Sequence, residues 1–182
     1  MSQKLALADV IISRLSRLIE DPYGNYLVQN VLKLDRAERN EQIFNVIAGD
    51  FVRLSQLKFS SNVIEKCLET KQAEAQVDKI FRGTHPSDDY TLVCELGVQS
   101  KHQPTRINFL VQRLAMHQFG NYVLQKVIYV VTDYKLKTQI LESIKLLSSS
   151  LSLTKHGPKV LQKLQKTYPR IFGNGNTTAA VS

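Results

Sequence analysis

Hydrophobic residues along this chain recur at helical spacing. Residues 23–32 place them at positions i, i+4, i+5, i+8 and i+9, and residues 123–131 place them at i, i+1, i+4, i+5 and i+8. Such a pattern puts an apolar stripe on one face of a helix, whereas a half-buried strand would alternate apolar and polar residues. Amphipathic helices are therefore predicted in segments 23–32, 59–68, 119–131 and 156–164.

Further helices are predicted on either side of these segments. The preceding helices are expected at 10–19, 51–57 and 107–116, the first of them ending before the turn signal Asp21-Pro22. The following helices are expected at 39–48, 74–81 and 137–147. The pattern indicates an all-α chain of three-helix units that bury their apolar stripes against one another.

The units are copies of one another. The sequence YGNYLVQNV at 23–31 is nearly repeated as FGNYVLQKV at 119–127, with a variant, FSSNVIEKCL, at 59–68 and a degenerate copy, HGPKVLQKL, at 156–164. Gly24, Ser60, Gly120 and Gly157 are thus equivalent, at intervals of 36, 60 and 37 residues. A period of this length is typical of a solenoid. We expect repeats at about 8–48, 49–82 and 104–146, a C-terminal cap at 147–170, and an inserted loop at 83–103. The insertion leaves open whether the second and third repeats keep the usual spacing.

Charge is unevenly distributed. The formal net charge is +8, and residues 100–182 carry 12 Lys and Arg against 2 Asp and Glu. A basic half fits either a polyanionic partner or a solubilising surface. Cys67 and Cys94 are the only cysteines and lack the paired Cys or His spacing of a zinc site. No apolar run reaches the length of about 18 residues that a membrane span requires, and no secretory signal is evident.

Polar residues recur at fixed positions of the copies. Asn25 and Gln29 lie four residues apart, as do Asn121 and Gln125, so each pair shares a helix face. Each Asn alone also fits a helix N-cap, but the recurring Gln favours a binding role for both pairs. The equivalent pair in the second copy is Ser61 and Glu65.

These motifs resemble Pumilio-type (PUF) repeats over about residues 8–170. Gly-Asn-Tyr-x-x-Gln occurs twice and Ser-Asn-x-x-Glu-Lys once, in register with the repeat. The resemblance implies a right-handed α-solenoid that binds single-stranded RNA, one base per repeat. It also implies that the chain corresponds to the C-terminal repeats and cap of such a domain.

The resemblance implies a role for each of these positions. Asn25/Gln29 and Asn121/Gln125 would each read uracil, and Ser61/Glu65 would read guanine, whose N1–H and N2–H suit a carboxylate acceptor. Because the family binds RNA antiparallel to the protein, the expected element is 5′-UGU-3′. The residues expected to stack on bases are Tyr26, Asn62 and Tyr122.

The fourth copy departs from the motif, because Pro158 replaces the Asn. We therefore expect it to cap the stack, with Lys155, Lys159 and Lys163 as candidate phosphate contacts. Residues 171–182 are rich in Gly, Asn and Thr and are expected to be disordered.

The sequence thus predicts a cytoplasmic, non-enzymatic protein that binds mRNA 3′ untranslated regions and represses translation or promotes decay with protein co-regulators. No cofactor, metal, membrane or small-molecule substrate is expected, because no phosphate loop, metal cluster or catalytic arrangement is present. The alternative is a protein-binding helical scaffold of the armadillo or HEAT kind, which would not require base-reading pairs in register.

Overall fold

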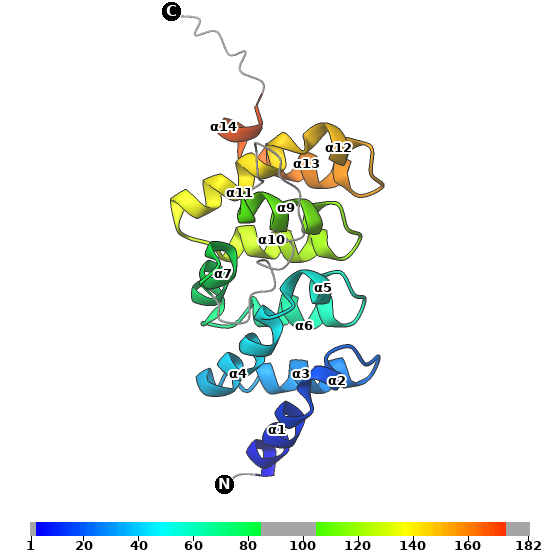
Figure 1. The fold of residues 1–182 in the computed structure, drawn as a ribbon, viewed down its shortest axis with the longest axis vertical. Helices are drawn as coiled ribbons and strands as arrows, with labels where there is room; N and C mark the ends of the chain where they lie inside the picture. The colour runs from blue at the N-terminus through cyan, green and yellow to red at the C-terminus, as the bar shows by residue number, and fades with distance from the viewer. Residues whose placement is uncertain (1–2, 85–104, 174–182) are drawn as a thin grey trace, which may run out of the picture.

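The computed structural model describes residues 3–84 and 105–173. Within these ranges the regular structure is entirely α-helical. Figure 1 shows the helices stacked in units along one long axis, with the N-terminal helix at one end and the C-terminal helix at the other. The expected all-α solenoid is confirmed.

Each unit contains three helices, of which the second begins at one of the equivalent residues identified in the sequence. The first unit contains α2 (Leu15–Leu18), α3 (Gly24–Leu32) and α4 (Ala37–Ala48). The second contains α5 (Phe51–Ser55), α6 (Ser60–Cys67) and α7 (Ala73–Arg82). The third contains α9 (Arg106–Ala115), α10 (Gly120–Val130) and α11 (Tyr134–Leu146). The C-terminal unit contains α12 (Ser148–Ser152), α13 (Gly157–Thr167) and α14 (Pro169–Phe172).

The N-terminal helix differs from the prediction. A single helix was expected over 10–19, but the structure has α1 (Gln3–Ser13) and α2, separated at Arg14 with φ −116° and ψ 16°. The periodicity of hydrophobic residues continues across this break, so it could not reveal the change of direction. In the order of helices, α1 takes the place of a closing helix like α4 or α11, and the first unit begins near residue 14 rather than 8.

The C-terminal boundary also differs by two residues. The helix α14 extends to Phe172, whose side chain is buried, so residues 171 and 172 belong to the folded cap rather than to a disordered tail. Most of the expected insertion at 83–103, and the tail beyond residue 173, lie outside the described residues.

Burial of equivalent residues shows how the units stack. Val63 and Val123, three residues into α6 and α10, are fully buried, whereas the equivalent Leu27 of α3 is 46% exposed. A preceding unit covers Val63 and Val123 but not Leu27. Leu27 lines an apolar groove of about 270 Å³ with residues of α1, including Leu7, at the N-terminal end of the stack.

The stack is continuous from the second unit to the third despite the 60-residue interval. The helix α9 packs on α5 and α7, and α10 packs directly on α6. The amide Nε2 of Gln56 donates a hydrogen bond to the carbonyl of Arg113 at 2.7 Å across this junction. The inserted residues therefore do not separate the second helices of these two units.

Within each unit, the first residue of the second helix lies against the backbone carbonyl six residues earlier. A Cβ added to Gly24 would lie 2.8 Å from the Leu18 oxygen, and one added to Gly157 would lie 1.8 Å from that of Leu151. Ser60 occupies this position in the second unit, and its hydroxyl donates to the Leu54 carbonyl at 2.6 Å. A small residue is needed here because the two helices meet through their backbones.

We expect Gly157→Ala to destabilise the C-terminal unit, because the added methyl group would overlap backbone atoms that cannot move independently. Overpacking of this kind costs about 1–3 kcal/mol, which would be measured as a lower midpoint of thermal unfolding by circular dichroism. Gly49→Ala is the control, because Gly49 has a helical φ of −63° and should tolerate alanine. An unchanged midpoint for Gly157→Ala would contradict the close approach.

Candidate functional site

The second helices α3, α6 and α10 lie side by side, since α6 packs on both of its neighbours. Each carries a polar residue five positions after its first residue, namely Gln29, Glu65 and Gln125. All three side chains are half-buried. The stack therefore brings together on one surface three side chains that the sequence places up to 96 residues apart.

The structure buries the Asn residues that were predicted to act with Gln29 and Gln125. Asn25 and Asn121 are 1% and 2% exposed. The Nδ2 group of Asn25 donates to the carbonyls of Asp21 and Pro22, both at 2.9 Å. Both of its N–H groups are thereby used, so Asn25 holds the turn before α3 in this structure.

Asn121 makes the same contacts before α10. Its Nδ2 donates to the carbonyls of His117 and Gln118 at 2.9 Å. These two acceptors set the orientation of the amide, so Oδ1 must face the next turn of the helix. There it accepts from Nε2 of Gln125 at 3.3 Å, as Asn25 Oδ1 accepts from Gln29 at 3.0 Å.

The Asn residues therefore orient the Gln residues. Because Nε2 of each Gln faces its Asn, Oε1 and the second N–H point away from the Asn. Oε1 of Gln125 accepts from Lys163, whereas Oε1 of Gln29 has no hydrogen-bond partner among the described residues. Gln29, oriented in this way, offers one acceptor and one donor to a ligand. Neither Asn is the N-cap, since Tyr23 and Phe119 occupy that position without a side-chain cap.

The second unit replaces the amide pair with a carboxylate. Ser61 is buried and its hydroxyl donates to the Lys58 carbonyl at 3.3 Å, so it too serves the turn. Asn62 is exposed and donates to the same carbonyl at 3.2 Å. Among the described residues, the Glu65 carboxylate has neither a hydrogen bond nor an ion pair, which leaves all of its acceptor capacity open.

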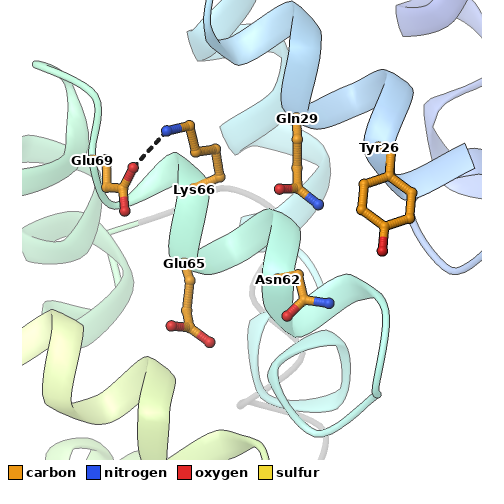
Figure 2. A pocket seen from close by; sticks show the side chains of 6 residues that line it. All are labelled: Tyr26, Gln29, Asn62, Glu65, Lys66 and Glu69. Carbon is orange, nitrogen blue, oxygen red and sulfur yellow. Dashed lines mark hydrogen bonds and ion pairs between the residues drawn. The ribbon is translucent and has the colours of Figure 1, made fainter.

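A groove of about 400 Å³ runs between the first two units at this point. Figure 2 shows Tyr26 and Gln29 of α3 on one side and Asn62 and Glu65 of α6 on the other. Tyr26 is 61% exposed, and its equivalent in the third unit, Tyr122, is 53% exposed. These rings lie at the surface, where a flat ligand could stack on them.

Charge around Glu65 is organised by an ion-pair cluster. Glu69 accepts from Lys66 at 2.6 Å and from Lys126 of the next unit at 2.7 Å. Burial raises the pKa of Glu65, an effect that the charge of Lys126 opposes and that of Glu69 reinforces. The hydrogen bonds from Lys126 and Lys66 lower the pKa of Glu69. The site thus holds one paired and one unpaired carboxylate.

The three lysines of the cap that were candidate phosphate contacts differ in their interactions. Lys155 and Lys159 are exposed. Lys163, also exposed, donates from Nζ to Oε1 of Gln125 at 3.1 Å, so the cap contacts the third unit's polar residue. In this structure Lys163 is engaged with the protein rather than projecting freely toward a phosphate.

Sequence reasoning missed Glu69 and assigned Lys126 no definite role. The two are 57 residues apart in the chain, so no local pattern joins them. His117 lies in the turn before α10 and holds it by hydrogen bonds. Nδ1 of His117 accepts from the backbone N–H groups of Phe119 and Gly120 at 3.2 and 3.4 Å.

Residues 3–84 and 105–173 contain neither a candidate metal site nor a membrane-spanning helix. No group of three His, Cys, Asp or Glu side chains in these ranges is arranged to hold a metal ion. Cys67 is buried, and burial raises the pKa of its thiol. None of the described helices has the length and apolar character needed to cross a membrane.

We expect Asn121→Ala to destabilise the protein more than Gln125→Ala. Removing the Asn121 amide leaves the Gln118 carbonyl without a donor in a part-buried turn and takes one of two donors from the His117 carbonyl, which costs about 1–3 kcal/mol. Gln125 makes only contacts that water can replace. Urea denaturation followed by circular dichroism would measure both, and equal losses would contradict a turn-holding role for Asn121.

We expect Glu65→Gln to stabilise the protein at neutral pH. Because burial raises the pKa of Glu65 in the folded state, folding favours its protonated form, and the charged form opposes folding above that pKa. The gain from Glu65→Gln should therefore be full at pH 7 and vanish below the ordinary Glu pKa of about 4.3.

Midpoints of thermal unfolding, measured from pH 7 to below the ordinary Glu pKa, would test this expectation. Glu20→Gln is the control. The pKa of Glu20 is lowered by its hydrogen bond with Arg53, so this substitution should destabilise at pH 7. A loss of stability for both variants would contradict the unpaired state of Glu65.

Comparison with known sequences identifies the repeats. The family model of the Pumilio-family RNA binding repeat matches residues 16–48, 50–82 and 111–145, more than half of the chain. The Pumilio domain-containing protein C6G9.14 of Schizosaccharomyces pombe is 30% identical over 163 residues, which cover 90% of this chain and 21% of that protein. Pumilio homolog 12 of Arabidopsis thaliana is 29% identical, covering 89% of this chain and 23% of that protein. The chain thus spans about a fifth of the length of these relatives.

Solved structures agree in fold. A crystal structure of PUF-8 in complex with PBE-RNA superposes with a TM-score of 0.66 and 26% identity, over 90% of this chain and 42% of that chain. The RNA-binding domain of yeast Puf5p bound to SMX2 RNA gives a TM-score of 0.64 and 25% identity, over 90% of this chain and 40% of that chain. The repeat matches, the relatives and the superposed folds lead to one conclusion: this chain belongs to the Pumilio family of RNA-binding repeat proteins.

Proposed function

We propose that this chain binds single-stranded RNA along the surface formed by α3, α6 and α10, and that it reads the element 5′-UGU-3′. The third unit takes the 5′ uracil through Gln125, the second takes guanine through Glu65, and the first takes the 3′ uracil through Gln29. The RNA complexes of PUF-8 and yeast Puf5p, which have a similar fold, support this proposal.

The observation that carries the proposal is the unpaired Glu65 carboxylate in the groove between the first two units. Placing a carboxylate in partial burial without a partner opposes folding, so a binding role accounts for it best. Guanine is the base whose Watson–Crick edge presents two adjacent N–H donors, at N1 and N2. Both carboxylate oxygens of Glu65 are available to accept them.

Uracil recognition rests on the oriented glutamines. The uracil edge offers N3–H as a donor between two carbonyl acceptors, which suits the outward-facing Oε1 and N–H of Gln29. Asn25 and Asn121 contribute by fixing this orientation. The neighbouring Tyr26, Asn62 and Tyr122 are exposed beside these side chains and are proposed to stack on bases, a contact worth about 1–3 kcal/mol per base.

At the cellular level, we propose that the target is the 3′ untranslated region of mRNA and that binding in the cytoplasm leads to translational repression or decay through protein co-regulators. The binding surface offers hydrogen-bonding and stacking groups rather than a nucleophile with an activating base, so any effect on the message would be indirect. The exposed Lys155 and Lys159 extend the surface in the direction of the RNA 5′ end.

Fluorescence polarisation with short single-stranded RNAs tests the proposal. We expect an RNA containing UGUA to bind at least about tenfold more tightly than one containing UCUA, since a bidentate base contact contributes about 1–3 kcal/mol of discrimination. Glu65→Ala should remove this preference. Titrations at two salt concentrations separate base reading from phosphate contacts, because only the latter depend strongly on salt.

Gln42→Ala serves as the control, because Gln42 is an exposed residue of α4 and outside the proposed surface. Equal, salt-sensitive binding of both RNAs would reduce the function to a basic surface without base reading. Absence of binding to either RNA would favour a protein-binding scaffold.

A further inference from the structure

Glu65 is unpaired although a lysine of the next unit lies near it. Lys126 follows Gln125 directly on α10, and its charge reaches Glu65 strongly enough to oppose the effect of burial on that residue's pKa. An ammonium group so placed would ordinarily pair with a carboxylate that has no other partner. Something in the structure therefore keeps the two groups apart.

Glu69 provides the competing acceptor. One of its oxygens accepts from Lys126 at 2.7 Å and the other from Lys66 at 2.6 Å, so both lysines near the groove are tied to the same carboxylate. Figure 2 shows the Lys66 ammonium turned to Glu69, while Glu65 extends from α6 without a partner among the residues drawn.

The difference in exposure explains why Glu69 holds the lysines. Glu69 lies just beyond the end of α6, and its side chain is 43% exposed, so pairing there costs little desolvation. Glu65 is half-buried in the groove, where pairing would require an ammonium group to lose more water. With Glu69 present, the arrangement of lower free energy is the one in which Lys126 pairs with Glu69 and Glu65 stays unpaired.

We propose that Glu69 is a specificity-determining residue of the guanine site, which keeps Glu65 available to a base by retaining Lys126 of the next unit. The inference rests on the proposed function, because it assigns Glu69 a role at the same base-reading site. Glu69 is a positioning residue in this account, since it acts through Lys126 and Glu65.

This role has a signature that a simple salt bridge or a simple phosphate contact lacks. Removing the charge of Glu69 frees two lysines and removes repulsion toward RNA, so overall RNA affinity should rise. At the same time Lys126 can pair with Glu65 and compete with the guanine N–H groups. Tighter binding with poorer discrimination is therefore expected from one substitution.

The experiment measures the affinity of the 182-residue chain for UGUA-containing and UCUA-containing RNA in wild type and Glu69→Gln. We expect Glu69→Gln to bind the UCUA RNA about two- to threefold more tightly, with a steeper salt dependence, and the preference for UGUA to fall from at least about tenfold to below about threefold. Circular dichroism verifies that the variant is folded.

Two further variants identify the cause. Glu69→Gln combined with Lys126→Met should restore the preference for UGUA, because the competing ammonium is gone. Glu20→Gln is the matched control: it removes one acid that also pairs across units, with Arg53 at 2.7 Å, but lies outside the groove. It should leave the preference unchanged.

The outcomes separate this inference from the proposed function. If wild type prefers UGUA and Glu65→Ala abolishes the preference, the function stands. If Glu69→Gln then keeps the full preference, or if the double variant fails to restore it, the role of Glu69 is overturned. If wild type shows no preference, both proposals fail together.

Discussion

The close approach of two helices within each unit is the constraint on which the candidate site depends. Gly24, Gly120 and Gly157 bring the start of the second helix against a backbone carbonyl six residues earlier, and Ser60 bonds that carbonyl directly. In this tight turn the carbonyls of Pro22 and Gln118 have no backbone donor among the described residues. Asn25 and Asn121 satisfy these carbonyls, and in doing so they set the direction of Gln29 and Gln125. The close packing of the helices thereby influences which hydrogen-bonding groups face the surface.

Stacking of the units converts that local pattern into an extended surface. Because Val63 and Val123 are buried against the preceding unit, the second helices are held next to one another at a fixed register. Ion pairs also join successive units, as between Arg53 and Glu20 or Lys126 and Glu69. Exposed pairs of this kind contribute little stability each. At the second-to-third junction, however, the pair also determines which charges face the groove.

The second unit illustrates a conflict between stability and binding. The environment of Glu65 suits a charged carboxylate poorly, since its pKa is raised by burial and by the charge of Glu69. A neutral residue there would fold more easily but, in the proposed function, could not offer two acceptors to a guanine edge. Immediately beside Glu65, whose environment is unfavourable, Glu69 makes favourable interactions with Lys66 and Lys126. The distribution of charge in the cluster is therefore best understood as a property of the site rather than of the fold.

Much of this architecture could be predicted from the sequence, because the repeated unit is encoded locally. Helical periodicity, the small residue at the start of each second helix and the recurring polar positions predicted α3, α6, α10 and α13 and the surface that carries Gln29, Glu65 and Gln125. Periodicity could not show the break at Arg14, since the hydrophobic pattern continues while the backbone changes direction.

Features that depend on contacts between units, or on the geometry of a turn, were decided only by the tertiary structure. The burial of Asn25 and Asn121, the contact of α6 with α10 across a long interval, and the pairing of Lys126 with Glu69 all belong to this class. The sequence by itself determined which side chains this protein presents. The three-dimensional stack decided which of them remain free to bind, because availability depends on neighbours that the linear order does not place side by side.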